Sequence, residues 1–377
     1  MTQQPEDDGL GPNLPVRLGD VFCDQRYKVL RFLGSGLYSK VWLVRDNRCA
    51  SYRALKILKP GCYGGEKNLF EREILSHLRD KDATHPGHAH IPHFFDTFEH
   101  NGPTGRHVCL VLELMVENLS TFPTIFDEDQ IPNAILKRFV KQLLLALDYA
   151  HQSGVIHTGQ DIQPNNIMIK IKDHSHVDEY LEATAADPSN PEPHIRNFFL
   201  TDYLQLDNLD VALCDWGSAS WTEKHLTELI QPELLRAPEV LLKAPWGPKV
   251  DIWNLGAVLP ELLEALRIFN GRANVTGGRY LVKHHLEETD ALLGPFTTWL
   301  LENGDRKTVS QYFQNSDGQW ELRDPIPRPK VHLGIWAESL NGTEKENFLA
   351  LLGSMMQIDP NRRKSAAELL KEPWLLD

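Results

Sequence analysis

The sequence predicts an α+β protein with a small strand-rich lobe followed by a larger, mainly helical lobe. Apolar and polar residues alternate in the segments between residues 27 and 57, which is the spacing of half-buried strands. Beyond residue 116, apolar residues recur at the spacing of helices packed on a core. We therefore expect a disordered tail over residues 1–13, a strand-rich lobe over 14–115 and a helical lobe over 116–377.

In the first lobe, three runs separated by turn residues predict successive strands: YKVLRFLG, SKVWLVRD and YRALKIL. The segment EKNLFEREILSHLR then changes to helical spacing, which places Leu69, Phe70, Ile74 and Leu78 on one face. The short apolar run HVCLVLELM predicts a further strand. This lobe is thus expected to be mostly strand, with one helix.

The second lobe begins with the long helical pattern AILKRFVKQLLLALDYAHQSG, in which Gly154 is the expected C-terminal cap. Residues 172–198 are polar and rich in Asp, Ser, Pro and His, so we expect a surface insertion there. Later helices surround VDIWNLGAVLPELLEAL and TEKENFLALLGSMM. Pro260 in the first of these predicts a bend, because an interior proline removes a backbone hydrogen bond.

Composition narrows the functional classes. The net charge of −13 disfavours nucleic acid and anionic membranes as partners and is compatible with a basic protein substrate. No apolar run approaches the roughly 18 residues that span a bilayer, and the polar N-terminus is unlike a signal peptide. Five scattered cysteines without metal-site spacing fit a reducing compartment. We expect a monomeric cytoplasmic protein, with the nucleus as the second candidate compartment.

The stretch LGSGLYSKV, from Leu33 to Val41, has glycines at positions 34 and 36 between two predicted strands. Glycine lets a hairpin lie close over phosphate groups and offer them backbone N–H groups. The glycines of a dinucleotide-binding turn are followed by a helix, whereas a strand is predicted here. By itself the pattern is a weak indication of a nucleotide site.

Lys56 lies in the next predicted strand, ALKIL, and the helix after it carries two candidate carboxylate partners. We favour Glu73 over Glu71, because Glu73 lies closer to the apolar side of the predicted helix. A lysine held by such a pair can bind the α- and β-phosphates of a nucleotide. A surface lysine on an edge strand is the alternative for an isolated motif of this kind.

The stretch VIHTGQDIQPNNIMIKI has the outline of a phosphotransfer loop, with His157, Asp161 and Asn166 in order. An Asp there can accept the proton of a hydroxyl substrate, and an Asn can ligate Mg²⁺. Two features depart from the usual loop. Gly159 and Gln160 lengthen the turn ahead of Asp161, and Gln163 stands where a lysine is expected.

Asp215, in CDWGSAS, follows the apolar strand VAL and precedes a glycine that permits a sharp turn. A carboxylate in this place can coordinate an Mg²⁺ ion that bridges nucleotide phosphates. The segments RAPEVLL, DIWNLG and DPNRR follow in order. Each signal is weak alone, but their fixed order and spacing make a chance match improbable.

In this combination the sequence resembles the eukaryotic protein kinases, and more closely the SR-protein kinases, which phosphorylate arginine/serine-rich splicing factors. The likeness covers residues 14–377, and the insertion at 172–198 falls where that family carries one. It rests on GDVFCDQRYKVLRFLGSG, GLYSKVWLVRD, GPTGRHVCLVLEL, the His-Thr pair of the loop and DWGSASWTEKHLTELIQPELLRAPEV. The resemblance implies the bilobal protein-kinase fold and an ATP-dependent serine/threonine protein kinase, with ATP and Mg²⁺ as cofactors and a basic or serine-rich protein as substrate.

The resemblance also implies a role for each matching catalytic residue. Asp161 is expected to accept the proton of the substrate hydroxyl, with Gln163 in the lysine position beside it. Asn166 and Asp215 are expected to hold Mg²⁺. Lys56 and Glu73 are expected to form the activating ion pair. Two structural roles are implied as well: Glu239 pairs with Arg363 in the interior, and Asp251 braces the catalytic loop.

The expected nucleotide-binding residues carry over in the same way. They are Leu33, Gly34, Ser35, Gly36, Val41, Ala54, Lys56, Leu112, Glu113, Met115 and Met168. The resemblance makes Leu112 the gatekeeper and assigns the adenine contacts to backbone groups of Glu113 and Met115. The side chains of Val41, Ala54 and Met168 are expected to sandwich the adenine ring.

The departures lead to three expectations. A bulge at Gly159 and Gln160 can be absorbed, because glycine tolerates positive φ, although it gives Asp251 less control of the loop. Thr158 replaces the arginine that reads an activation-loop phosphate, so activity is expected without such phosphorylation. Gln163 offers only a neutral hydrogen bond, and losing one charged stabiliser lowers a rate on the order of 10²-fold.

Alternatives remain open at this point. One is a pseudokinase, which binds ATP or partners with little or no phosphotransfer. Another is a small-molecule kinase, which the RAPE segment disfavours because it builds the peptide shelf in the resembling family. The acidic stretch HHLEETD is either a docking surface for basic substrates or a solvated helix face. Pro232 and Glu233 stand where the family carries Thr and Arg, so handling of already phosphorylated substrates is in doubt.

Overall fold

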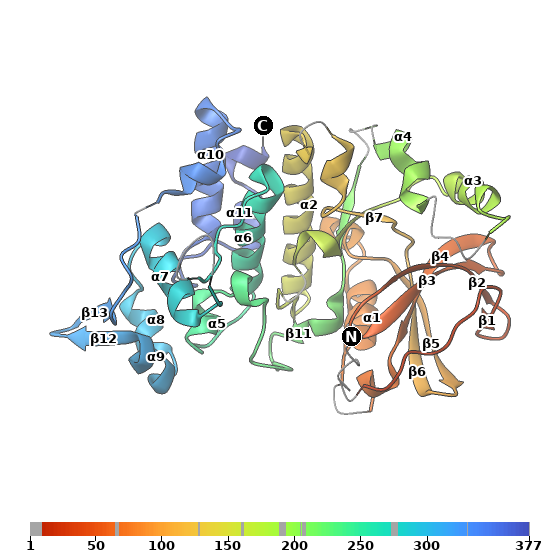
Figure 1. The fold of residues 1–377 in the computed structure, drawn as a ribbon, viewed down its shortest axis with the longest axis horizontal. Coiled ribbons are helices and arrows are strands. Elements are labelled where there is room, and N and C mark those ends of the chain that lie inside the picture. The colour runs from red at the N-terminus through yellow and green to blue at the C-terminus, as the bar shows by residue number, and fades with distance from the viewer. Residues whose placement is uncertain are drawn as a thin grey trace. The chain divides into compact units, whose positions relative to one another are not determined.

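The structure is a computed structural model that describes residues 10–64, 68–126, 129–159, 162–187, 194–203, 205, 209–272, 278–329 and 331–376. The chain divides into two compact units (Figure 1). Unit 1 comprises Met1–Ala83, Ile91–Glu117 and Met168–Ala212, and unit 2 comprises Thr84–His90, Asn118–Ile167 and Leu213–Asp377. Unit 1 is rich in strands and unit 2 is mainly helical, so the predicted α+β class is confirmed.

Unit 1 is built on a six-stranded antiparallel sheet in the order β1-β2-β3-β4-β6-β5. Its strands are β1 (Val21–Phe22), β2 (Tyr27–Ser35), β3 (Ser39–Asp46), β4 (Ser51–Leu58), β5 (Phe94–Gly102) and β6 (Gly105–Leu112). The alternation seen in the sequence is the reason that one face is buried: Tyr27, Val29, Val44 and Leu55 belong to a single apolar cluster. The strands expected over residues 27–57 are confirmed.

Helix α1 (Glu71–Lys81) is the expected helix of the first lobe, and its buried residues include Ile74 and Leu78. The expected tail differs from the structure over residues 10–13; residues 1–9 lie outside the described part. Leu10 is buried, and its carbonyl accepts a hydrogen bond from the N–H of Gly61 at 2.9 Å. A buried, hydrogen-bonded residue is ordered, so the tail prediction is wrong for this end of the segment.

The insertion also differs from the expectation, because it forms α3 (Ser175–Ala183), followed by α4 (Leu200–Tyr203), and belongs to unit 1 rather than to the helical unit. Contacts with the sheet explain the difference. The guanidinium of Arg31 on β2 donates to the carbonyl of Thr184 at 2.6 Å and lies over the Tyr180 ring. The hydroxyl of Tyr52 on β4 donates to the carboxylate of Asp178. Only part of the insertion is therefore surface.

Unit 2 is organised around α2 (Asn133–Gln152) and α6 (Lys249–Glu264), which lie side by side (Figure 1). The predicted apolar stripe of α2 is fully buried: Phe139, Val140, Leu143, Leu144 and Leu147. Gly154 follows the end of α2 with φ +75°, a conformation that suits glycine, so the predicted stop is confirmed. Helix α6 continues through Pro260 to Glu264.

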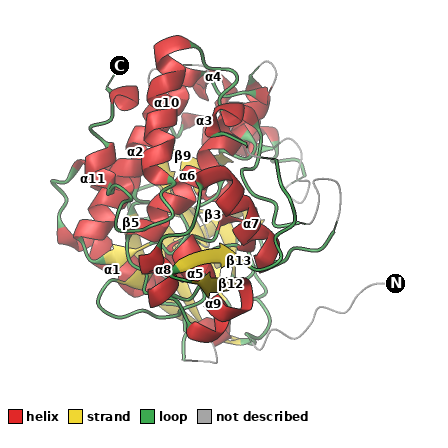
Figure 2. Cartoon of the chain, turned by 90° about the vertical axis from the view of Figure 1, so that its left-hand side faces the viewer, coloured by secondary structure: helices red, strands yellow, loops and turns green. Residues whose placement is uncertain are grey.

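The remaining elements of unit 2 surround this pair of helices. Helix α10 packs against α6 (Figure 2). The others are β8 (Val155–Ile156), β11 (Ser220–Trp221), α5 (Pro238–Leu241), α7 (Val282–Leu293), α8 (Thr298–Asn303), α9 (Arg306–Tyr312), β12 (Phe313–Ser316), β13 (Gln319–Leu322), α10 (Gly342–Met355) and α11 (Ala366–Leu369). A short sheet has the strand order β10 (Val211–Leu213), β9 (Ile167–Ile169), β7 (Glu117–Asn118). These strands contain the sequence positions at which the chain passes from one unit to the other.

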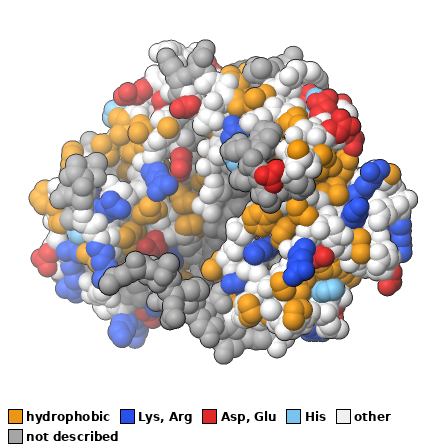
Figure 3. Space-filling model, turned by 45° about the vertical axis from the view of Figure 1, so that its right-hand side comes forward, with side chains coloured by type: hydrophobic (Ala, Val, Ile, Leu, Met, Phe, Trp, Pro, Cys, Tyr) orange, Lys and Arg blue, Asp and Glu red, His pale blue; other side chains and the backbone are white. Residues whose placement is uncertain are grey.

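A buried ion pair supports unit 2. Arg363 and Glu239 are both fully buried and make two hydrogen bonds, at 2.7 and 3.0 Å. This bidentate geometry is the one that best offsets the cost of burying two charges. Over the described residues, no helix has the length and apolar character needed to cross a membrane. Charged side chains of both signs are interspersed with apolar ones on the face shown in Figure 3.

Candidate active site

The glycine-rich hairpin joins β2 to β3 in unit 1. The N–H of Gly36 donates to the carbonyl of Ser39 at 2.9 Å, and Gly34 stands opposite Val41 in the register. A Cβ built on Gly34 would meet no atom within 4 Å, and one on Gly36 would meet only Ser39 Oγ, at 3.9 Å. Packing of the protein therefore does not require either glycine. The open space over their backbone is what the close approach of a phosphate group requires.

Lys56 lies on β4, opposite Val41 on β3 and Leu110 on β6. Its ammonium contacts the carboxylate of Glu71 at 2.7 Å, and the Glu71 side chain is only 2% exposed. Glu73 was the predicted partner, and that prediction is wrong: Glu73 is 38% exposed and pairs with Arg72. The reason is the position of α1, whose buried face consists of Glu71, Ile74, Leu75 and Leu78.

The chain after β6 carries the expected adenine-binding backbone. The N–H of Glu113 donates to the carbonyl of His93 at 2.9 Å, which leaves the Glu113 carbonyl as the backbone group able to accept from a base. The Glu113 carboxylate is held by the ammonium of Lys170 at 2.6 Å. This ion pair was not foreseen from the sequence. It fixes the segment that also contains Met115.

All of the expected nucleotide-binding residues lie in unit 1. Ala54 is buried, whereas Leu33, Val41, Met115 and Met168 are half-buried apolar side chains. Partial exposure of apolar groups beside an open glycine hairpin is suited to an aromatic ring ligand. The sheet register pairs Val41 with Gly34 and Lys56, and Ala54 with Leu112, so these expected binding residues share one sheet, whereas Met115 and Met168 lie outside its strands. Nucleotide binding by this set stays a prediction.

The catalytic loop lies in unit 2 and is pinned by Asp251 of α6. One carboxylate oxygen of Asp251 accepts from the backbone N–H of His157 and from His151 Nε2, both at 2.8 Å. The His157 ring approaches the carbonyl of Cys214 at 3.1 Å through Nε2. Burial lowers the pKa of His157, because desolvation disfavours the charged ring. The pinning by Asp251 is therefore intact despite the longer turn.

The two residues expected to hold Mg²⁺ are joined through the backbone. The N–H of Cys214 donates to the carbonyl of Asn166 at 2.8 Å, and Asp215 follows directly with φ 60° and ψ 70°. This left-handed conformation is uncommon outside glycine and is enriched at functional sites. Asp161 lies outside the described residues, and so does Gln160. Gln163 is half-buried, and its carbonyl accepts from the N–H of Asn166 at 2.9 Å.

The segment after Asp215 is ordered by contacts that need no phosphate. The rings of His225 and Trp246 are stacked with centroids 3.6 Å apart, and the indole N–H of Trp246 donates to Glu228 at 2.9 Å. Ser220 Oγ accepts from the backbone N–H of Leu226 at 2.8 Å. These contacts fit the expectation, drawn from Thr158, that the segment does not depend on phosphorylation.

The acidic stretch on α7 is neither an open docking surface nor a solvated face over its central residues. Glu287 is buried and contacts His284 at 2.9 Å and Arg328 at 3.5 Å. The Glu288 carboxylate accepts from the N–H groups of Asn270 and Gly271, at 3.0 and 2.8 Å. Burial raises the pKa of Glu288. These carboxylates serve the fold, so they do not support a basic substrate.

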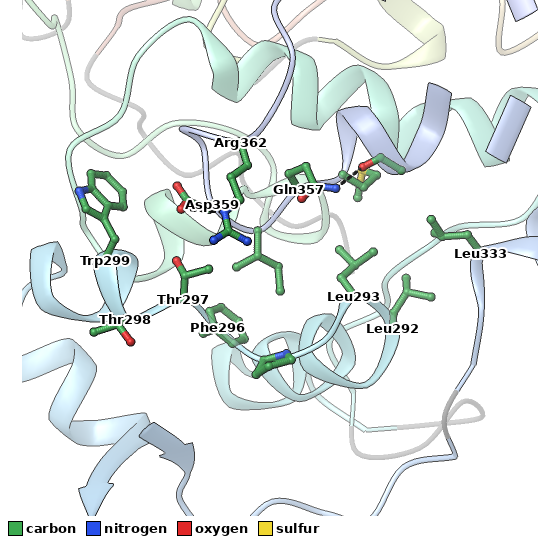
Figure 4. Close-up of a pocket in the computed structure, with 14 residues that line it drawn as sticks. Leu292, Leu293, Phe296, Thr297, Thr298, Trp299, Leu333, Gln357, Asp359 and Arg362 are labelled. Carbon is green, nitrogen blue, oxygen red and sulfur yellow. Dashed lines mark hydrogen bonds and ion pairs between the residues drawn. The ribbon is translucent and has the colours of Figure 1, made fainter. Parts of the chain in front are cut away.

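A depression of about 760 Å³ in unit 2 is unrelated to these residues (Figure 4). It is lined by apolar side chains, among them Leu292, Leu293 and Phe296, with Asp359 and Arg362 on another side. None of the residues predicted from the sequence to bind nucleotide or Mg²⁺, or to take part in catalysis, lines it.

Some residues of the site were missed by the sequence analysis. Glu71 could have been found, because it lies three, four and seven residues before Ile74, Leu75 and Leu78, which is the spacing of one helix face. Lys170 and Asn254 gave no comparable signal, since their importance depends on partners distant in the sequence.

Comparison with known proteins agrees with this geometry. Residues 27–375 match the protein kinase domain family. A serine/threonine protein kinase of Aspergillus fumigatus is 34% identical over 372 residues, which cover 96% of this chain and 87% of the relative.

Two further relatives are more distant and equally extensive. Serine/threonine-protein kinase SRPK of Physarum polycephalum is 28% identical, with 99% of this chain and 91% of the relative covered. Protein kinase dsk1 of Schizosaccharomyces pombe is 26% identical, with 99% and 85% covered.

Proposed function

This chain belongs to the protein kinase family, within its SR-protein kinase group, and we propose that it transfers the γ-phosphate of Mg²⁺-bound ATP to serine in basic, arginine/serine-rich protein segments. Serine/threonine protein kinase activity follows from the family and from the relatives' functions. The observation that carries phosphate transfer from ATP is the ion pair between Lys56 and the buried Glu71, at 2.7 Å. A half-buried, paired lysine opposite Val41 of the glycine hairpin is suited to nucleotide phosphates.

The residues present fit Mg²⁺ and ATP. Asn166 and Asp215 offer oxygen ligands, which Mg²⁺ prefers, and the space over Gly34 and Gly36 is free of protein atoms at the positions that side chains would fill. When bound, Mg²⁺ neutralises the charge of the phosphate oxygens. Lys56 would bind the α- and β-phosphates, and Glu71 keeps its ammonium in place.

The remaining roles follow from the chemistry of the loop. Asp161 would accept the proton of the substrate hydroxyl and orient that oxygen toward the phosphoryl group. Gln163 would donate a neutral hydrogen bond where most related loops place a cation, so the chemical step is expected to be slow. The hydrogen bond from the His157 N–H to Asp251 holds the loop that carries these residues.

Two observations support a basic substrate. The chain has a net charge of −13, which favours association with cationic peptides, and the relatives include a protein named SRPK. Glu233 is exposed beside the RAPE segment, where the resembling family carries an arginine. A carboxylate in that place favours a basic residue over a phosphorylated one. This preference differs from that of a kinase that acts beside serines that are already phosphorylated.

A phosphotransfer assay on a peptide array tests the proposal. Wild-type protein with Mg²⁺-ATP is expected to label serine peptides rich in arginine more strongly than acidic ones, and Asp161→Asn is expected to abolish the signal. Labelling of acidic peptides alone would contradict the substrate class. Binding of ATP without labelling of any peptide would contradict the kinase function and favour a pseudokinase.

We propose the cytoplasm as the compartment, with entry into the nucleus, as the substrate class requires. None of the five cysteines, all of which the structure describes, forms a disulfide, which fits a reducing environment. Microscopy of a fluorescently tagged full chain tests this proposal. Retention of the tagged chain in secretory compartments would contradict it.

A further inference from the structure

Asn254 lies on α6, three residues after Asp251, and its side chain is fully buried. Its amide Nδ2 donates to the carbonyl of Ile162 at 2.9 Å. Ile162 is the residue that directly follows Asp161 in the sequence. The side chain therefore holds the chain immediately downstream of the expected catalytic base.

The same side chain contacts the loop on the upstream side, at Gly159. A Cβ on Gly159 would lie 2.0 Å from Asn254 Oδ1 and 3.0 Å from Gln231 Cγ. Gln231 cannot move aside easily, because its side chain donates to the carbonyl of Val250 and accepts from the N–H of Ala237. Gly159 also has φ +59°, so both space and conformation require glycine.

The loop before this contact is held in a strained conformation. Thr158 has φ 66°, which a β-branched residue rarely adopts, and it is fully buried. Its hydroxyl donates to the carbonyl of Ser218 at 2.7 Å. A backbone in such a conformation persists only when its surroundings fix it. Asp251 fixes the loop at His157, and Asn254 fixes it at Gly159 and Ile162.

Most buried residues of α6 are apolar, so packing alone gives no reason for an amide at position 254. A buried amide is costly unless its polar atoms are paired, and Oδ1 of Asn254 accepts no hydrogen bond from the residues that the structure describes. The amide is thus retained in spite of this cost. Its one hydrogen bond, to Ile162, lies beside the expected catalytic base.

We propose that Asn254 is a positioning residue for phosphotransfer: its carboxamide holds Gly159 and Ile162, on the two sides of positions 160 and 161, and so compensates for the longer turn. The inference rests on the proposed kinase function. It adds a restraint from α6 to that of Asp251, whose described hydrogen bond to the loop is from the His157 N–H, at the start of the loop.

Steady-state kinetics of Asn254→Ala tests the proposal, with Val258→Ala as the matched control. Val258 is also fully buried on α6, so its variant should lower the melting temperature without a specific effect on the loop. We expect Asn254→Ala to lower kcat by roughly 10- to 100-fold, the scale of a small misplacement of a catalytic group, with KM for ATP within about twofold. If Asn254→Ala does not fold, Asn254→Ser is compared in the same way. A kcat loss no larger than that of Val258→Ala would overturn the proposal.

Gly159→Ala gives a second, independent test through a double-mutant cycle. Alone it should lower kcat strongly, because its methyl group would collide with Asn254 Oδ1. In the double variant with Asn254→Ala, which removes that oxygen, kcat should fall by less than the product of the two separate losses. Strictly additive effects would show that the two residues do not interact, and would overturn the proposal.

Hydrogen exchange separates this inference from the kinase function. Backbone amides over residues 157–166 should exchange at least tenfold faster in Asn254→Ala than in Val258→Ala at equal thermal stability. If the wild-type protein transfers no phosphate, the proposed function fails and exchange still decides the positioning role. Equal exchange in the two variants would overturn that role.

Discussion

At the residue scale, the pairing of Lys56 can be tested by comparing two neutral variants on α1. Glu71→Gln should lower kcat/KM for ATP by about 10- to 100-fold, because it removes the buried charge that holds the Lys56 ammonium in place. Glu73→Gln should change it by less than about threefold, since Glu73 is 38% exposed, its ion pair with Arg72 is at the surface, and a glutamine can still accept from the Tyr63 hydroxyl. Steady-state kinetics at saturating peptide measures both. Equal losses in the two variants would contradict the assignment.

Gln163 carries the second prediction at this scale. Gln163→Lys should raise kcat by about 10-fold, or about 1.4 kcal/mol of barrier, with KM for ATP nearly unchanged. The interaction of a cation with the phosphoryl group strengthens as negative charge shifts in the transition state, whereas the ground state is stabilised little. Gln314→Lys, an equal charge change at an exposed position of β12, is the control. No gain in single-turnover rate, with chemistry rate-limiting, would show that another group already serves this role.

Individual residues show where prediction from the sequence succeeds and where it fails. The ion pairing of Lys56 and the bracing of the loop by Asp251 could be predicted, because each residue lies in a short motif on one strand or helix, whereas the Mg²⁺ role of Asp215 stays a prediction. Glu73 was chosen over Glu71 because the start of α1 was misjudged, and a shift of two residues reverses the face of a helix. Asn254 could not be found, since its contacts are with residues more than ninety positions earlier.

At the scale of elements, the segment after Asp215 predicts independence from phosphorylation. Protein made in bacteria and treated with phosphatase should keep its full kcat, because Trp246, His225 and Glu228 already order the segment. Trp246→Ala should lower kcat by about 10-fold or more, whereas Trp299→Ala, at a partly exposed position of α8, should not. A large loss of activity on dephosphorylation would refute the prediction.

Helix α3, in the insertion, could not be predicted from the sequence. Its composition is polar, and only Val177 and Tyr180 are buried, three positions apart. One such pair is too short a pattern to indicate a helix with a packed face. The contacts that dock it come from Arg31 and Tyr52, on strands far earlier in the chain. Long elements such as α2 were predictable, because their apolar stripe repeats over several turns.

For the whole molecule, the division into a strand-rich and a helical unit follows from a change of hydrophobic period along the sequence, so it could be predicted. The assignment of residues 168–212 to the first unit could not, because it depends on contacts of the inserted segment. The residues expected to bind the nucleotide belong to unit 1, and Asn166 and Asp215, the expected Mg²⁺ ligands, belong to unit 2. A nucleotide and its metal, if bound only by the folded protein, should raise its melting temperature.

Thermal unfolding with ATP and Mg²⁺ tests this last prediction. A ligand bound only by the folded state adds RT ln(1 + [L]/Kd), which is about 2.7 kcal/mol at 100 times Kd, so the melting temperature should rise with ATP concentration. The rise should be larger with Mg²⁺ than with EDTA in the wild type. In Asp215→Asn the rises with Mg²⁺ and with EDTA should be similar, because an amide binds Mg²⁺ more weakly than a carboxylate.

Lys56→Met should reduce the rise under both conditions, since it removes the cation expected at the phosphates rather than a metal ligand. No rise in the wild type at millimolar Mg²⁺-ATP would refute nucleotide binding, whereas equal rises with Mg²⁺ and EDTA would refute only the metal site.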